Sequence, residues 1–375
     1  MNQATVEFRH ATKQYGPQGA VIDLSLLVPA GEICVLVGPS GCGKTTSLKM
    51  VNRLVEPSSG QVLIDGQDVM SVDVTELRRR IGYVIQQIGL FPHQTIAENV
   101  ATVPNLLGWP KQRIRDRVEE LLELIGLDPA RVRNRYPAQL SGGERQRVGV
   151  ARAMAAEPPV MLMDEPFGAV DPIVRERLQN EFLRLHRTLG TTVLFVTHDI
   201  DEAIKMGNRV AVMQQGGKLA QYAPPTELLL QPANDFVARF VGVDRGLKRL
   251  TLLNVSDVAL EEAPLARVGE SVEAIRRRVG DAHWVLLLDT AERPEGWINL
   301  AQTQAATLSA DAVDPSSPIV TFETTLRDAL SMLLASAVQT AVVVDEHGRY
   351  AGVVTLDALG AAFRASPEQT AAGVA

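Results

Sequence analysis

Residues 38–46 read Gly38-Pro39-Ser40-Gly41-Cys42-Gly43-Lys44-Thr45-Thr46, and they match the pattern G-x-x-x-x-G-K-[ST] at every fixed position. The run before this stretch, residues 33–37, is apolar and rich in β-branched types, which favours a strand buried on both faces. Residues 45–54 favour a helix. A strand, a glycine-rich loop and a helix in this order form a nest of backbone N–H groups, which binds phosphate. We therefore expect this stretch to hold the phosphates of a nucleoside triphosphate.

Two side chains of the loop add specific chemistry. Lys44 is placed to reach the β- and γ-phosphates, and the Thr45 hydroxyl is placed to ligate Mg²⁺. Cys42 fills a variable position of the loop, where we interpret it as a filler rather than a reactive thiol. With Cys34 it makes up the whole cysteine content, which is too little for a disulfide framework and favours a cytosolic protein.

Composition narrows the classes of protein. A length of 375 residues predicts two domains, and 46% hydrophobic with 22% charged residues is ordinary for a soluble protein. The net charge of −7 argues against nucleic acid as the main partner. No apolar run approaches the roughly 18 residues that a membrane-spanning helix needs, and the first residues lack the features of a signal peptide.

A pair of acids follows a second apolar run. Residues 160–163 are all apolar, and Asp164 and Glu165 come directly after them, as if a buried strand delivered two carboxylates to the edge of a sheet. Asp164 is placed to hold Mg²⁺ through water, as the acidic half of a phosphate-loop site. Glu165 is placed to polarise the attacking water. The sequence therefore predicts hydrolysis of the nucleotide and not binding alone.

Two further residues have alternative readings. Tyr15 precedes the loop by about 20 residues, where it either stacks on a nucleotide base or lies on the surface. His198 ends a buried strand that begins at Thr192, and it is either a structural or solvated histidine or one that reaches the γ-phosphate. Spacing alone does not decide between these alternatives.

The rest of the first 243 residues has mixed character. Short strands are expected at residues 6–9, 20–28, 60–66 and 80–86, the last ending in a glutamine. Residues 95–156 are helical in pattern and look like an insertion into an α/β core. A helix over residues 171–189 begins with Asp-Pro at its N-cap and first turn.

Composition changes after about residue 243. Residues 1–240 contain 26 acids and 26 bases, whereas residues 241–375 contain 18 acids and 11 bases. The second part also contains an internal repeat with a spacing of about 56 residues. Each copy has a helix, then a strand ending in Asp (residues 285–289 and 341–345), then a turn and a second strand (residues 296–300 and 352–356).

The helical block contains Leu140-Ser141-Gly142-Gly143-Glu144-Arg145-Gln146. With this motif between a phosphate loop and an Asp-Glu strand, residues 1–243 resemble the ATP-binding subunits of ABC transporters. The resemblance implies an α/β P-loop NTPase core of the ABC ATPase type, with an antiparallel β subdomain and a helical subdomain at about residues 88–156. Glu144 replaces the glutamine that is commoner after LSGG.

The resemblance implies a role for each matching residue. Tyr15 looks like the aromatic residue that stacks on adenine, and residues 38–46 look like the phosphate loop. Gln86 looks like the glutamine that contacts Mg²⁺ and faces the membrane subunits. Asp164 looks like the metal-side acid, and Glu165 looks like the catalytic base.

The remaining matches concern a second protomer. Ser141, Gly142 and Gly143 look like the signature that closes on ATP held by the partner, since a hydroxyl and two N–H groups at a helix start form a second phosphate nest. Asp171 lies in a stretch that resembles the loop joining the two sites, and His198 looks like the switch histidine. Two chains would then pair head to tail with C2 symmetry and enclose two ATP molecules.

The repeat resembles a tandem CBS module, an α+β domain. We divide it into a degenerate first copy at residues 244–308, a second copy at 309–366 and a disordered tail at 367–375. An ABC subunit with this appendage is similar to the importers of quaternary amines, and residues 87–92 and 95–100 also look like that branch. Nucleotide-binding copies often have Thr-x-x-Asp after the second strand. Thr355-Leu356-Asp357 is one residue short of that pattern.

These resemblances imply the ATPase subunit of a binding-protein-dependent importer for glycine betaine, carnitine, choline or proline betaine. It would work with ATP and Mg²⁺ as a homodimer on the cytoplasmic face of the membrane, beside integral-membrane permease subunits and an extracytoplasmic substrate-binding protein, and without nucleic acid. The alternatives are the same machine with another small cargo such as an amino acid, a non-transport ABC ATPase that acts on DNA or ribosomes, and a regulatory CBS protein with a decayed ATPase.

The repeat is expected to regulate transport and to take no part in hydrolysis. A basic patch on an anionic membrane would be the simplest sensor of ionic strength. Arg276, Arg277 and Arg278 are consecutive and therefore make no single helix face. Lys248 and Arg249 are candidates for a small local patch, and gating by a ligand between the copies is the alternative.

Overall fold

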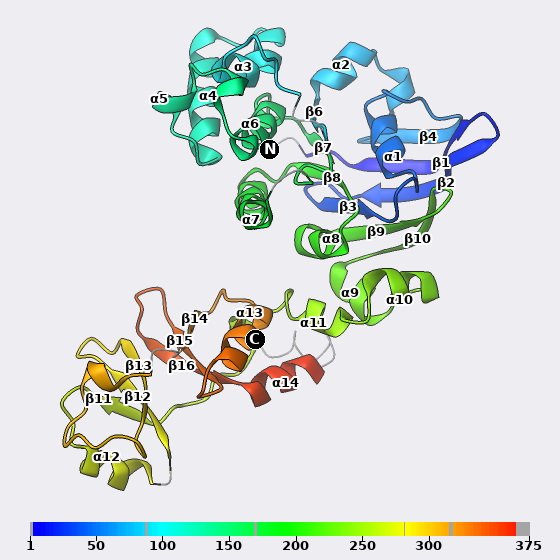
Figure 1. Ribbon diagram of the computed structural model, residues 1–375. Coiled ribbons are helices and arrows are strands. Elements are labelled where there is room, and N and C mark those ends of the chain that lie inside the picture. The colour runs from blue at the N-terminus through cyan, green and yellow to red at the C-terminus, as the bar shows by residue number, and fades with distance from the viewer. Residues whose placement is uncertain (1–2, 87–88, 169–170, 281, 315–317, 365–375) are drawn as a thin grey trace. The chain divides into compact units, whose positions relative to one another are not determined.

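The structure, a computed structural model, describes residues 3–86, 89–168, 171–280, 282–314 and 318–364. The chain falls into two units, Met1–Gly242 (unit 1) and Val243–Ala375 (unit 2). Figure 1 labels the helices and strands of both.

A six-stranded sheet lies at the centre of unit 1, in the order β10-β9-β3-β8-β7-β6 (Figure 1). Neighbouring strands are parallel, except that β10 is antiparallel to β9. Three strands, β3, β7 and β8, are buried along their whole length, as their unbroken apolar runs predict. Because parallel strands run in one direction, the carboxyl ends of β3, β6, β7 and β8 meet at the same edge. The strand bounds are β3 (Ile33–Val37), β6 (Ile81–Val84), β7 (Val160–Asp164), β8 (Thr192–Thr197), β9 (Arg209–Gln214) and β10 (Lys218–Ala223).

A second sheet of unit 1 is antiparallel, in the order β2-β1-β4-β5. Its strands are β1 (Val6–Tyr15), β2 (Gln18–Val28), β4 (Ser59–Ile64) and β5 (Gln67–Asp68). The strand predicted at residues 6–9 continues to Tyr15 through register shifts in its pairing with β2. The predicted antiparallel β subdomain is therefore present.

Helices connect and cover these sheets. The predicted helical insertion contains α3 (Ile96–Leu106), α4 (Lys111–Leu124), α5 (Pro129–Val132) and α6 (Gly142–Met154), with a 3₁₀ turn at Pro137–Gln139. The other helices of unit 1 are α1 (Lys44–Val51), α2 (Val74–Arg79), α7 (Pro172–Leu189), α8 (Ile200–Met206), α9 (Pro225–Leu230) and α10 (Asp235–Val241), with a 3₁₀ turn at Val69–Ser71. Most of the predicted elements are found within a few residues of their expected bounds.

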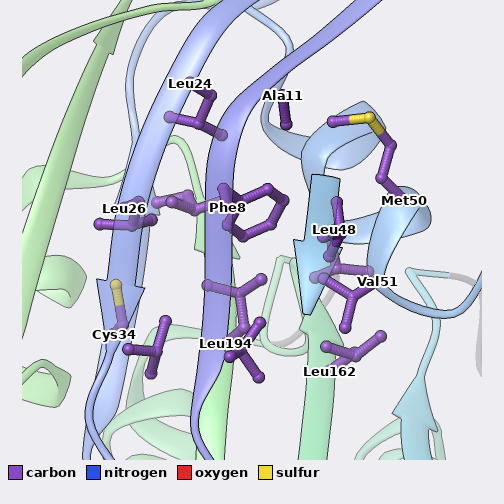
Figure 2. Close-up of a cluster of buried hydrophobic side chains, with 14 of the residues drawn as sticks. Phe8, Ala11, Leu24, Leu26, Cys34, Leu48, Met50, Val51, Leu162 and Leu194 are labelled. Carbon is purple, nitrogen blue, oxygen red and sulfur yellow. The ribbon is translucent and has the colours of Figure 1, made fainter. Parts of the chain in front are cut away.

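The two sheets of unit 1 share one hydrophobic core. Phe8, Leu24 and Leu26 of the antiparallel sheet and Leu162 and Leu194 of the parallel sheet belong to one cluster of buried side chains. Helix α1 contributes to the same cluster, so the helix that follows the phosphate loop is fixed between both layers (Figure 2). This packing makes the loop a rigid part of the fold and not a surface appendage.

Two predicted elements end earlier than expected. Helix α1 stops at Val51, because Arg53 adopts a left-handed φ of 52° that no helix can continue through. Strand β6 stops at Val84, so Gln86 lies in the segment after the strand and not in it. The stretch from residue 87 to 92 that we matched to quaternary amine importers begins with residues 87 and 88, which lie outside the described part of the chain.

Unit 2 contains two copies of one motif: strand, helix and two further strands. The first copy consists of β11 (Leu265–Arg267), α12 (Val272–Val279), β12 (Trp284–Leu288) and β13 (Pro294–Asn299). The second consists of β14 (Ile319–Thr321), α13 (Leu326–Ala335), β15 (Thr340–Val344) and β16 (Tyr350–Thr355). Helices α11 (Arg245–Arg249) and α14 (Leu356–Arg364) flank the pair, with 3₁₀ turns at Val255–Asp257 and Ala310–Ala312.

The predicted spacing of 56 residues holds in atomic detail. The Asp289 carboxylate accepts the N–H groups of Ala291 and Arg293, and the Asp345 carboxylate accepts those of His347 and Arg349. The copies also pack together, since Leu286, Leu288 and Trp297 form one buried cluster with Val342 and Val353. The two copies of the repeat therefore share a hydrophobic cluster.

The boundary drawn at residues 308 and 309 does not separate the two cores. That division assigns Leu250 and Val255 to the first copy. They precede its first strand, β11, and are buried in the core of the second copy, with Leu326 and Val343. The backbone of Glu261 likewise pairs with Val353 of the second copy. The tail from residue 367 lies outside the described residues.

The candidate basic patch is wrong. Lys248 and Arg249 are each only 8% exposed, because Lys248 pairs with Asp244 and Arg249 donates to the backbone carbonyl of Phe363. A formal charge in the sequence does not reveal that a side chain is buried.

The arginine run has no common face, as predicted. Arg276 donates to the carbonyl of Leu300, Arg277 pairs with Glu273, and Arg278 pairs with Glu270. The three side chains are therefore held by three different partners and do not form one basic surface.

Candidate functional site

The carboxyl ends of four parallel strands carry the predicted site residues. Loop 38–43 follows β3, Gln86 follows β6, Glu165 follows β7 and His198 follows β8. The sheet topology therefore brings together residues that are up to 160 positions apart in sequence, at the edge where open α/β sheets bind ligands.

Two positions of the loop must be glycine because neighbouring backbone packs closely against them. Gly38 and Gly43 have φ values of 156° and 96°, and a Cβ at either would lie 2.2 Å from a backbone oxygen, of Met213 and of Ala20 respectively. No other residue fits at these two positions without moving the backbone. The loop is therefore held against its neighbours in one shape.

Lys44 lies inside the curve of this loop. Its Nζ donates to the carbonyls of Gly38 at 2.8 Å and Pro39 at 3.0 Å, and the residue is 6% exposed. Burial raises the pKa of the Cys42 thiol, although the Lys44 ammonium opposes this shift. The thiol is thus kept neutral, which agrees with a filler and not with a reactive cysteine.

Thr45 and Asp164 meet at the base of the loop. The Thr45 hydroxyl donates to the Asp164 carboxylate at 2.9 Å, and Asp164 is 5% exposed. Burial raises the pKa of Asp164, while the Thr45 hydroxyl and the charges of Lys49 and Lys44 lower it. A buried carboxylate beside a hydroxyl is a donor set that Mg²⁺ prefers, and such a cation would stabilise the charged form. The residues present therefore fit the metal.

Glu165 is held between two other site residues. Its Oε2 accepts a hydrogen bond from Gln86 Nε2 at 3.3 Å, and its Oε1 lies 3.2 Å from His198 Nδ1. Its backbone has a left-handed φ of 45°, and its N–H donates to Val196 of β8 at 2.9 Å. A non-glycine residue in this conformation is strained and marks a position that the surrounding structure enforces. The acid thus faces both the segment after β6 and the turn after β8.

The signature residues lie at the start of α6. Ser141 is the N-cap: its hydroxyl accepts the N–H of Glu144 at 3.3 Å, and the Glu144 carboxylate accepts the N–H of Ser141 at 2.8 Å. This backbone hydrogen bond is the main reason that the pKa of Glu144 is lowered. Glu144 completes a capping box, which gives its presence in the motif a structural reason. Ser141 and Gly142 remain exposed at the helix start.

Two predicted residues have their described contacts outside this cluster. Tyr15, at the end of β1, is 53% exposed, with Lys13 Nζ 5.3 Å from its ring centroid. Asp171 caps α7 by accepting the N–H of Ile173. Residues 169 and 170 of the predicted joining loop lie outside the described residues. The roles of both residues stay predictions.

Sequence reasoning missed three buried polar residues. Gln146 of α6 donates to the carbonyl of Pro166, directly after Glu165, and Gln179 of α7 donates to Glu202 of α8. All three are under 9% exposed. The sequence signal for these residues is a polar residue on the apolar face of a predicted helix. This signal is weak, because Gln and Glu side chains are usually solvated.

The chain is similar to known proteins over most of its length. The family model described as ABC transporter matches residues 21–168, and the model described as CBS domain matches residues 310–363. An osmoprotectant import ATP-binding protein of Salmonella typhimurium is 47% identical, with 94% of each chain covered. A glycine betaine/carnitine/choline transport ATP-binding protein of Bacillus subtilis is 42% identical, with 93% of this chain and 94% of that protein covered.

Solved structures agree on the fold of unit 1. The dimeric structure of a bacterial ABC transporter cassette is 34% identical, has a TM-score of 0.53 and covers 59% of this chain and 98% of its own. A post-hydrolysis state of the same cassette, bound to ADP and Pi, matches equally. The predicted fold class is confirmed. Among the described residues, no helix is both long enough and apolar enough to cross a membrane.

We expect Glu165→Gln to lower the rate of ATP hydrolysis by about 10²- to 10⁴-fold, because the amide keeps the shape but cannot accept a proton from water. ATP binding should persist. The measurement is steady-state ATPase activity alongside equilibrium binding of ATP.

Lys44→Ala is the matched control for Glu165→Gln, because it removes the cation of the phosphate loop and should weaken ATP binding itself. A Glu165→Gln protein that hydrolyses ATP at close to the wild-type rate would show that Glu165 is not the base.

Proposed function

We propose that this chain drives a binding-protein-dependent importer of quaternary amine osmolytes. The chain belongs to the ATP-binding proteins of ABC transporters and is an ATPase. Glycine betaine, carnitine, choline and proline betaine are the candidate cargoes. The observation that carries the catalytic part is the contact of Glu165 with both Gln86 and His198 beside the phosphate loop. The full-length similarity to osmolyte import proteins, across both units, supports the cargo.

The proposed chemistry uses the residues at the edge of the sheet. Lys44 and the N–H groups of loop 38–46 bind the phosphates, and Glu165 accepts a proton from the attacking water while His198 faces the γ-phosphate. Thr45, Asp164 and Gln86 would hold Mg²⁺, which supplies charge neutralisation at the β- and γ-phosphates when bound. Tyr15 would stack on the adenine.

We propose that the working form is a homodimer. Ser141, Gly142 and Gly143 form a helix start, exposed at Ser141 and Gly142, whose N–H groups and hydroxyl suit a phosphate of the partner's ATP. Asp171 would lie in the loop between the two sites. A dimeric solved relative of unit 1 supports this arrangement. Permease subunits and an extracytoplasmic binding protein would complete the transporter, with this chain on the cytoplasmic face of the membrane.

Ser141→Arg should abolish ATP-dependent dimerisation of Glu165→Gln protein, because a bulky cation fills the signature nest. Nucleotide binding should stay largely intact, since the phosphate loop is untouched. Sedimentation with and without ATP measures the dimer. An unchanged dimer in Ser141→Arg would exclude the signature from the interface.

The cargo is tested with the assembled transporter. We expect the membrane partners to co-purify with this chain, and ATP hydrolysis to rise when a quaternary amine and the binding protein are added. An amino-acid panel is the matched comparison, because it represents the alternative cargo. Stimulation by amino acids and not by quaternary amines would overturn the osmolyte proposal while leaving the ATPase assignment intact.

Unit 2 is proposed to regulate transport. Its described residues contain none of the proposed hydrolytic side chains, and a chain ending after Val243 should therefore keep ATP binding and basal hydrolysis. Transport into vesicles by a complex with this shortened chain should lose its dependence on internal salt or on a cytosolic nucleotide. If that dependence is unchanged, unit 2 is a dimerisation device instead.

A further inference from the structure

His198 has an exposed side chain, and its position must be set by the backbone turn that carries it. The side chain is 60% exposed, so packing around the ring contributes little to its position. Its direction therefore depends on the backbone turn between β8 and α8, which carries Thr197, His198 and Asp199. Any network that fixes this turn also fixes the distance from His198 Nδ1 to Glu165.

A buried chain of hydrogen bonds lies behind this turn. The backbone N–H of Asp199 donates to the Thr197 hydroxyl at 3.1 Å. Burial raises the pKa of Glu202, and hydrogen bonds from Thr197 and Gln179 lower it. Gln179 Nε2 donates to the same carboxylate at 3.0 Å. Thr197, Gln179 and Glu202 are 2%, 6% and 8% exposed, so water does not substitute for these bonds.

The direction of these bonds follows from the chemistry of a hydroxyl. The lone pairs of the Thr197 hydroxyl accept the N–H of Asp199, which leaves its one proton for the Glu202 carboxylate, whose pKa Thr197 lowers. The backbone N–H of Glu202 in turn donates to the Asp199 carboxylate at 3.4 Å, which ties Glu202 to the same turn. The carboxylate thereby orients the hydroxyl, and the hydroxyl holds the peptide group on the far side of His198. The Asp199 side chain adds a second restraint by accepting the N–H of Asp201 at 2.8 Å as the cap of α8.

Gln179 connects this turn to another part of the site. It lies on α7, which begins at Pro172, shortly after Glu165 in the sequence. One buried carboxylate on α8 thus joins α7 and β8, the two elements next to the proposed base and the proposed switch histidine. The order of residues in the sequence does not reveal this connection.

We propose that Glu202, with Thr197 and Gln179, is a positioning network that sets His198 against Glu165 for hydrolysis. This inference rests on the proposed function, in which His198 acts at the γ-phosphate. Because its members are buried behind the turn that carries His198, we expect their loss to lower turnover and to leave the binding of ATP unchanged.

Thr197→Val keeps the volume of the side chain and removes the hydroxyl. We expect kcat of ATP hydrolysis by the full-length chain to fall by about ten-fold, because a small misplacement of a catalytic group has a large effect on rate. KM for ATP should stay within about two-fold of the wild-type value. Thr197→Ser retains the hydroxyl and should restore most of kcat.

Thr192→Val is the matched control. Thr192 is buried at the other end of the same strand, and its hydroxyl accepts the N–H of Gly31 at 2.8 Å. This substitution should lower the thermal midpoint, because it leaves the partly buried N–H of Gly31 without its acceptor, but it should not change kcat. A loss of kcat equal to that of Thr197→Val would mean that general destabilisation, and not positioning, explains the effect.

A double-mutant cycle with His198→Ala separates the two hypotheses. If the network acts through His198, Thr197→Val should change the residual kcat of the His198→Ala protein by less than about two-fold. An undiminished ten-fold effect in that background would overturn the positioning role. If His198→Ala hydrolyses ATP at the wild-type rate, the proposed role of His198 fails, and this inference fails with it.

Gln179→Met provides an independent route if Thr197→Val does not fold. It removes the donor from α7 while keeping a similar volume. A fall in kcat with KM unchanged, again absent in the His198→Ala background, would support the network. A kcat equal to that of the wild type would overturn it.

Discussion

The parallel alignment of β3, β6, β7 and β8 is the constraint on which the rest of unit 1 depends. Strands buried on both faces can keep their hydrogen bonds only by running side by side, and their ends then meet at one edge. No pairwise attraction is needed to bring Lys44, Gln86, Glu165 and His198 together. Burial of the apolar strands stabilises the fold, and the order of the strands then places the site residues at one edge of the sheet.

The core also explains why the site tolerates strain. Gly38 and Gly43 pass within van der Waals contact of neighbouring backbone, and Glu165 has a left-handed backbone conformation. These features are stable because α1 and two sheets pack into one cluster beneath them. A phosphate loop on a less rigid base would relax, and it would lose the arrangement of N–H groups that binds anions.

Much of this could be predicted from the sequence, and the failures have physical causes. The loop, the Asp164-Glu165 strand and the 56-residue repeat depend on local patterns, which a sequence displays directly. Glu202 and Gln179 were missed because their burial depends on which helix face meets which strand. The burial of Lys248 and Arg249 is hidden from the sequence for the same reason, since a formal charge does not reveal what covers the side chain.

In unit 2, the segment before the first copy of the repeat belongs to the core of the second copy, and this affects the order in which the unit can fold during synthesis. Leu250 and Val255 are made before the first copy of the repeat but are buried in the second. The segment before the first copy must therefore wait, with its apolar side chains exposed, until the last strands of the second copy have been made. The first copy behaves as an insertion within the second, so the module cannot be divided into two halves by cutting the chain once between them.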